Sequence, residues 1–129
     1  MRYKFKQLIF MQKLTTSEEE IMQYLWELER ATVSQIIEQM PEPRPPHSTI
    51  SSFIRILEKK DFVSHKAYGK THEYFPLVSK EQYSTRSVME LVRDYFDGSV
   101  NSLVSFLVKD EKVNVAELEE MLKKRTENN

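Results

Sequence analysis

The 129-residue chain contains no cysteine and only two glycines. The absence of cysteine excludes disulfide bonds, thiolate metal sites and a cysteine nucleophile, and it is typical of cytoplasmic proteins. Two glycines are too few for a glycine-rich phosphate loop or a dinucleotide-binding fingerprint. This argues against nucleotide-dependent enzymes, and the overall prediction is a protein that catalyses no reaction and binds no cofactor.

The sequence also offers little to a membrane or a metal ion. No apolar run reaches the roughly 20 residues that a membrane-spanning helix needs, and the basic N-terminus lacks the apolar region of a signal peptide. The three histidines, His47, His65 and His72, have neither the i, i+4 helical spacing nor the carboxylate motif of a zinc site. We predict a cytoplasmic protein without metal and without membrane insertion.

The net charge of −1 is unevenly distributed along the chain. Residues 44–80 carry seven basic and three acidic side chains, a net charge of +4, whereas residues 14–43 carry one basic and seven acidic side chains, a net charge of −6. Residues 81–129 have a net charge of −3. A polyanionic partner would therefore bind the middle of the chain.

The middle of the chain has the element order of a winged helix-turn-helix. Apolar residues at i, i+3, i+4 and i+7 predict a short helix over 32–40, with Thr32 as its cap, and a second helix over 48–60 after a proline-rich connection. Two strands over 62–77 are predicted to pair as a hairpin around Gly69-Lys70, with Lys66 opposite Glu73.

The second predicted helix has a polar face with no acid before Glu58. A face of this kind can be a solvated helix surface, but hydroxyl, imidazole and cationic groups suit a polyanionic, hydrogen-bonding partner such as duplex DNA. The predicted DNA-binding residues are His47, Ser48, Thr49, Ser51, Ser52, Arg55, Lys59, Lys60 and, at the hairpin tip, Lys70.

The C-terminal third is predicted to be three short helices with more apolar surface than they can bury among themselves. A symmetric partner subunit is the simplest cover for that surface. The predicted dimerisation residues are Val88, Leu91, Val92, Tyr95, Val100, Leu103, Val104, Leu107, Leu118, Met121 and Leu122.

The fold class that follows is mainly α with a small β-hairpin wing. The winged-helix DNA-binding domain is expected over residues 14–78, with a helix that opens at Thr16 or Ser17 through capping partners Glu19 and Glu20. A helical dimerisation domain is expected over 79–125 and a polar tail over 126–129. Residues 1–13 are expected to be a basic extension. It is either a disordered or misassigned tail, an arm that contacts DNA, or an added edge strand.

The residues at these positions resemble the penicillinase-repressor (BlaI/MecI) family over about residues 13–124. The resemblance lies in the segments Leu14–Met22, Leu25-Trp26, Ser48–Ile50, Leu57–Lys60, Gly69-Lys70, Tyr74–Pro76 and Ser102–Val104. It implies a dimeric repressor that places a winged helix on each half of a palindromic operator in double-stranded DNA. It also implies a membrane sensor protease as a partner, which cuts the C-terminal domain to release the repressor.

The chain departs from the family pattern in three respects. The bond at the family's cleavage position is Phe106-Leu107 here, where the β-lactam-responsive members have Asn-Phe. The cysteines of the copper-responsive branch are absent. The arginine of the recognition helix stands one place early, at Arg55, with Ile56 at the usual position, so that Arg55 could reach a phosphate instead of a base.

An alternative from another class is a winged-helix adaptor that binds a protein and no DNA. Salt-dependent binding to duplex DNA distinguishes the two, because a protein that neutralises phosphates releases counterions.

Overall fold

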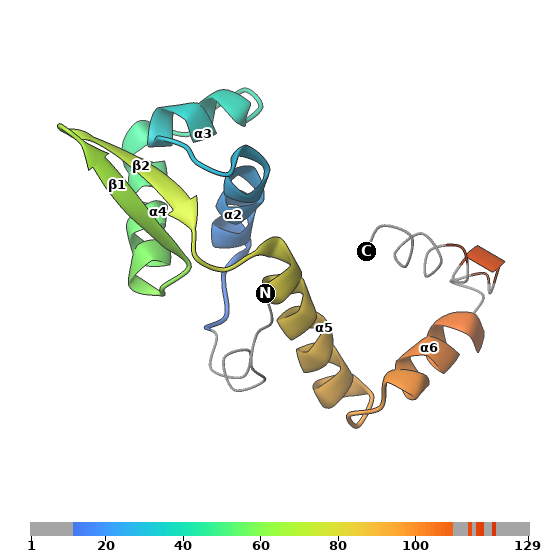
Figure 1. Cartoon of the computed structure of the whole chain (residues 1–129). Helices are drawn as coiled ribbons and strands as arrows, with labels where there is room; N and C mark the ends of the chain where they lie inside the picture. Colours follow the sequence, from blue (N-terminus) through green and yellow to red (C-terminus); the bar gives the residue numbers. More distant parts are fainter. Residues whose placement is uncertain (1–11, 110–113, 115, 118–119, 121–129) are drawn as a thin grey trace. The chain divides into compact units, whose positions relative to one another are not determined.

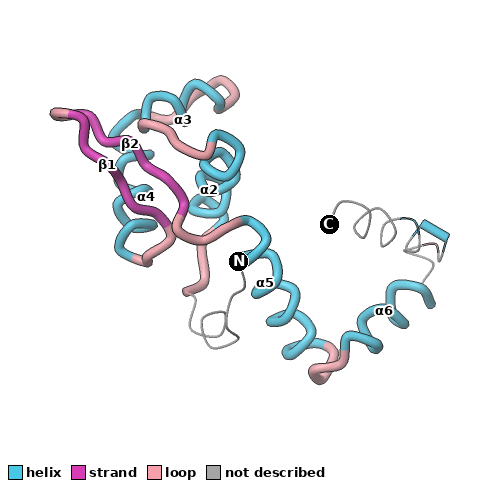
Figure 2. Tube along the Cα trace, in the orientation of Figure 1, coloured by secondary structure: helices cyan, strands magenta, loops and turns pink. Residues whose placement is uncertain are grey.

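The computed structural model describes residues 12–109, 114, 116–117 and 120 (Figure 1). Its contacts divide the chain into one unit that ends at Arg86 and a second that begins at Ser87. The elements are α2 (Thr16–Leu28), α3 (Val33–Gln39), α4 (His47–Lys59), β1 (Val63–Tyr68), β2 (Thr71–Pro76), α5 (Lys80–Tyr95) and α6 (Val100–Lys109). Figure 2 shows the two strands as one hairpin beside three helices, so the predicted fold class is confirmed.

The cap of the first helix lies one residue earlier than the sequence predicted, although the helix itself begins at Thr16. Thr15 is the cap of α2: the Glu18 amide donates to its hydroxyl at 3.2 Å, and its own amide donates to Glu18 Oε1 at 3.0 Å. The prediction that Glu19 or Glu20 completes the capping box was therefore wrong. Consecutive hydroxyl and acidic residues allow several capping registers, and the tertiary partner of Glu18, described below, selects this one.

The second helix has the predicted cap. Thr32 and Gln35 form a reciprocal capping box at the start of α3, with an amide-to-side-chain distance of 2.9 Å in one direction and 3.2 Å in the other. Helix α4 follows Pro46, which offers no side-chain cap. Its first turn therefore leaves the backbone amides without a side-chain acceptor at the cap position.

The core of the first unit lies where α2, α3 and α4 meet the hairpin. Fully buried side chains come from each helix and from the base of the hairpin: Ile21, Met22, Leu25, Ile36, Ile54, Leu57, Phe62 and Val63. Each stabilises the fold by roughly 1.5–3 kcal/mol relative to an exposed side chain. Trp26 is half-buried and packs against this cluster.

The hairpin has the register that the sequence predicted. Lys66 pairs with Glu73 and Tyr68 with Thr71, and Gly69 turns the chain with a φ of 64°. Two further backbone hydrogen bonds, 2.8 and 2.9 Å long, join Tyr74 of β2 to Ala31 before α3. These bonds anchor the wing to the helices and thereby fix its position beside α4.

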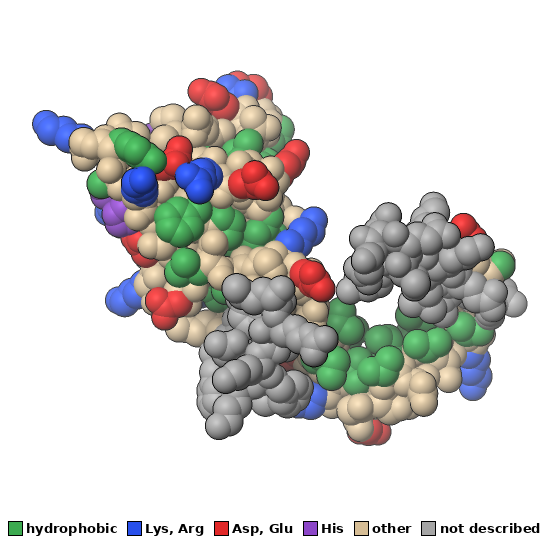
Figure 3. All heavy atoms as spheres, viewed as in Figure 1, with side chains coloured by type: hydrophobic (Ala, Val, Ile, Leu, Met, Phe, Trp, Pro, Cys, Tyr) green, Lys and Arg blue, Asp and Glu red, His purple; other side chains and the backbone are tan. Residues whose placement is uncertain are grey.

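The second unit comprises the later part of α5, a turn and α6. Asp97 and Gly98 form the turn after α5 and have positive φ angles of 50° and 79°. The rings of Phe96 and Phe106 pack with their centroids 5.5 Å apart. Apolar side chains gather over α5 and α6 (Figure 3). Within the described residues, no helix is long and apolar enough to span a membrane.

Candidate nucleic-acid interface

Helix α4 turns its apolar and polar faces in opposite directions. Ile50, Ile54 and Leu57 are buried in the core, at 3% exposure or less. The polar side chains of the other face are exposed, apart from the half-buried Ser51; the exposed set is His47, Ser48, Thr49, Ser52, Arg55 and Lys59. Apolar anchoring on one side therefore presents a row of hydrogen-bonding groups on the other.

A groove of about 380 Å³ runs between this polar face and the wing. Three elements contribute polar side chains to it, and the lining residues are Thr32, Val33, Ser34, His47, Ser51, Arg55, Lys70, Thr71, His72 and Tyr74. The groove brings four of the predicted DNA-binding residues together: His47, Ser51 and Arg55 of α4 and Lys70 at the wing tip. Figure 3 shows cationic side chains at the outer end of the hairpin.

Two side-chain contacts order the polar face of α4 itself. The Ser51 hydroxyl lies 3.3 Å from His47 Nδ1, and the Ser52 hydroxyl donates to the Ser48 carbonyl at 2.9 Å. The Ser52 contact occupies its proton but leaves its oxygen able to accept a hydrogen bond. The Ser52 hydroxyl can therefore still accept a hydrogen bond from the amino group of a base.

A row of four side chains links α4 to the hairpin next to the groove: Glu58, His65, His72 and Tyr74, of which the last two line the groove. His65 Nδ1 lies 2.6 Å from Glu58 Oε2, which joins β1 to α4. The rings of His65 and His72 stack at a centroid distance of 4.1 Å, and His72 meets Tyr74 edge-on at 6.2 Å. Burial raises the pKa of Tyr74 and the Glu58 charge raises it further, against a lowering by Arg55. The phenol therefore remains neutral beside the guanidinium.

Sequence reasoning did not assign the groove residues Thr32, Ser34, Thr71 and His72 to the interface. The sequence predicted Thr32 only as a helix cap, and His72 was considered as a possible metal ligand. The alternation of β2 could have indicated His72, because His72 and Tyr74 are two residues apart and share one face of the strand.

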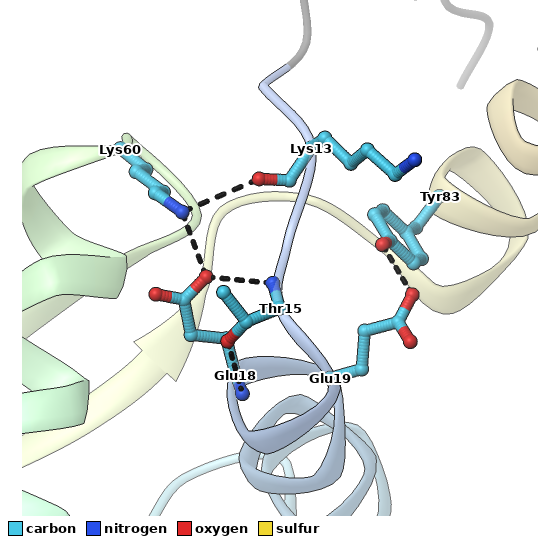
Figure 4. Close-up of polar contacts among 6 residues, drawn as sticks. All are labelled: Lys13, Thr15, Glu18, Glu19, Lys60 and Tyr83. Atoms are coloured by element: carbon cyan, nitrogen blue, oxygen red, sulfur yellow. Dashed lines mark hydrogen bonds and ion pairs between the residues drawn. The ribbon is translucent and has the colours of Figure 1, made fainter.

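Lys60 differs in its surroundings from the other predicted DNA-binding cations. Its ammonium donates to Glu18 Oε1 at 2.7 Å and to the Lys13 carbonyl at 3.2 Å (Figure 4). Lys59, by contrast, is exposed. The contact of Lys60 with phosphate stays a prediction, whereas its ion pair with α2 is part of the fold.

The described residues contain no group of three or more His, Asp or Glu side chains that could hold a metal ion. The stacked His65 and His72 rings lie in nearly parallel planes, 10° apart. Their nitrogen lone pairs therefore do not converge on one point.

The predicted dimerisation residues of the second unit differ in exposure. Val88, Leu91, Tyr95, Val100 and Val104 are exposed, with Tyr95 the most exposed at 76%. Leu103 and Leu107 are half-buried and Val92 is fully buried. Leu118, Met121 and Leu122 lie outside the described residues. The predicted cleavage bond joins Phe106, which is 44% exposed, to Leu107 within α6.

Comparison with known proteins gives one family and several relatives. The family model described as Penicillinase repressor matches residues 14–127. The methicillin resistance regulatory protein MecI of Staphylococcus aureus strain N315 is 30% identical over 111 residues, covering 84% of this chain and 89% of that protein. The protein of the same name from Mammaliicoccus sciuri is 28% identical over 110 residues, with the same coverages.

A solved structure was also found to be similar. It is the adhesin competence repressor of Streptococcus pyogenes, 18% identical, which matches 94% of this chain and 86% of its own with a TM-score of 0.44.

Proposed function

The chain belongs to the penicillinase repressor family, and from this premise we propose that it represses transcription by binding a palindromic DNA operator as a homodimer. Its similarity to regulatory proteins fits a role that involves no catalysis. The proposed binding element is α4, in the major groove, with the wing on the adjacent backbone.

The observation that carries the proposal is the groove shared by α4 and the wing. Arg55 and Lys70 supply cations from two different elements, and His47 and Ser51 add hydrogen-bonding groups between them. A phosphate backbone passing along this groove would meet both charges, while side chains farther along α4 could reach base edges. The adjacent exposed residues Ser48, Ser52 and Lys59 extend the same surface. Thr49 lines a separate hollow between α4, α2 and the proline-rich connection, so its contact with DNA stays a prediction.

The proposed dimer uses the second unit. Apolar side chains from both α5 and α6 remain exposed there, including Leu91 at 42%, Val100 at 51% and Val104 at 37%. Covering them with the same surface of a second chain would remove them from water. The dimer would join two winged helices and so raise the effective concentration of the second at its half-site.

The proposed release from DNA is a proteolytic cut in α6 by a sensor protease. Phe106 packs on Phe96 and lies in the interior of a helix that runs from Val100 to Lys109. A protease binds an extended chain, so the cut at Phe106-Leu107 requires α6 to unwind locally. Cutting would break the covalent link between α5 and the segment that begins at Leu107.

The decisive experiment measures binding to duplex DNA as a function of salt concentration. A protein that neutralises phosphates gives a linear fall of log K with log salt, whereas a protein-binding adaptor gives no binding to duplex. Arg55→Ala is the test variant and Lys80→Ala the matched control, because Lys80 is exposed but lies outside the groove. Equal binding by the two variants would contradict the assigned surface.

A further inference from the structure

The two adjacent acids in the first turn of α2 contact two different elements (Figure 4). Glu18 pairs with Lys60, directly after the end of α4, at 2.7 Å. Glu19 accepts a hydrogen bond from the hydroxyl of Tyr83, in the first turns of α5. One helical turn therefore contacts both the end of the proposed recognition helix and the beginning of the helix that leads out of the winged helix.

The ring of Tyr83 is buried and packs against two other aromatic rings. Its side chain is 8% exposed and packs against Trp26, with centroids 5.8 Å apart, and edge-on against Phe62 at 5.7 Å. The indole of Trp26 donates to the Val78 carbonyl at 2.8 Å, which fixes the chain just before α5. All these residues lie in the unit that ends at Arg86.

The start of α5 is also well defined. Ser79 and Gln82 form reciprocal capping bonds, with the Gln82 amide 3.1 Å from the Ser79 hydroxyl and the Ser79 amide 2.7 Å from Gln82 Oε1. From there α5 continues to Tyr95 without glycine or proline, past the residue at which the first unit ends. Glycine and proline are common causes of a kink in a helix, and this stretch has neither.

The phenol of Tyr83 is a donor at neutral pH. Burial raises the pKa of Tyr83, and the hydrogen bond to Glu19 and the Glu19 charge raise it further. The hydroxyl therefore keeps its proton, and the carboxylate of Glu19 is the acceptor.

We propose that Tyr83 is a positioning residue: its contacts with Glu19, Trp26 and Phe62 restrict the directions in which α5 leaves the winged helix, and so set the half-site spacing that a dimer accepts. The inference rests on the proposed function. Two winged helices joined through α5 bind both halves of an operator only if their separation matches the DNA, where one helical turn is about 34–36 Å. A loosened start of α5 would let them match several spacings, each at a lower effective concentration.

The DNA test compares Tyr83→Phe, which removes only the hydroxyl, and Tyr83→Ala, which removes the ring, with Tyr24→Phe on α2 as control. A palindromic operator is first selected from random duplexes with the parent protein. Affinity is then measured for a single half-site of it, for the selected operator at its natural spacing and for one with its half-sites moved apart by about 5 bp, roughly half a helical turn. We expect half-site affinity to stay within about twofold and the preference for natural spacing to fall roughly tenfold in Tyr83→Ala, and by less in Tyr83→Phe.

A merely structural role would lower half-site and full-site binding together, because unfolded protein binds neither. An unchanged spacing preference in Tyr83→Ala would overturn the proposal.

A second test needs no DNA and uses the absence of cysteine from the chain. Cysteines introduced at the exposed positions Gln23 and Arg93 carry spin labels, and the labelled chain is mixed with excess unlabelled chain so that distances are measured within one chain. We expect a broader distance distribution in Tyr83→Ala than in the parent, and equal widths would overturn the restriction on α5. Broadening in a protein that binds no duplex would overturn the operator role while leaving the restriction intact.

Discussion

The carboxylate of Glu18 and the ammonium of Lys60 meet at 2.7 Å, although 42 residues separate them in the sequence. Glu18 is 3% exposed, and its oxygen also accepts the backbone amide of Thr15. The ion pair joins the first turn of α2 to the residue after α4. It therefore contributes to the position of the proposed recognition helix from its C-terminal end.

Replacement of Lys60 is expected to destabilise the fold. Lys60→Met leaves a buried carboxylate without its cation, and the free energy of unfolding should fall by about 2–4 kcal/mol. Urea denaturation measures the loss, with Lys59→Met as the control, since the exposed Lys59 should change stability by roughly 0.5 kcal/mol or less. Adding Glu18→Gln to Lys60→Met should recover part of the loss; strictly additive losses would contradict a coupled pair.

The stability of the protein should depend on pH through Glu18. Burial raises the pKa of Glu18, but hydrogen bonds from Lys60 and Thr15 and the Lys60 charge together lower it below its ordinary value of 4.5. A lowered pKa in the folded state stabilises the fold above pH 4.5, and this contribution is lost as the pH falls from there through the folded-state pKa.

Urea denaturation at a series of acidic pH values tests this dependence. The free energy of unfolding should fall less steeply with decreasing pH in Glu18→Gln than in the parent. Parallel curves would show that the protonation of Glu18 does not cause the pH dependence of the free energy of unfolding.

Lys70 is expected to contact phosphate and to read no base. Lys70→Ala should weaken binding to all duplex sequences alike and reduce the slope of log K against log salt by about 1. Titrations at several salt concentrations, with operator and unrelated duplexes, measure both effects. A changed sequence preference at an unchanged slope would instead assign Lys70 to base recognition.

A charge in the proposed dimer surface should separate the subunits. Leu103→Asp or Leu107→Asp places a carboxylate among apolar side chains, and the protein should sediment as a monomer with weakened operator binding. Ser105→Asp is the control, because Ser105 is an exposed polar residue of the same helix. A dimer that persists in both leucine variants would place the subunit contact elsewhere.

A cut in α6 should release the repressor from DNA. A specific protease site introduced at Phe106-Leu107 allows cleavage of the DNA-bound protein, and dimer stability should fall by several kcal/mol, given roughly 1.5–3 kcal/mol for each large side chain exposed. Binding is followed during cleavage, with an uncleavable version of the inserted site as control. Full retention on the operator after complete cutting would contradict this mechanism.

Local patterns in the sequence determined the helices and the hairpin. The apolar spacing of Ile50, Ile54 and Leu57 predicted the buried face of α4, because a helix returns to the same direction about every 3.6 residues. Gly69-Lys70 predicted the hairpin register, because a two-residue turn leaves one way for the strands to pair.

Only the tertiary structure decided which of several equivalent neighbours made a contact. Three adjacent acids follow Thr15-Thr16-Ser17 in the sequence, yet Glu18 meets Lys60 and Glu19 meets Tyr83. The groove likewise depends on how the wing packs beside α4. Periodicity gives the direction of a side chain within its own element, whereas its partner depends on how distant elements pack together, and that is set by the shape of the whole core.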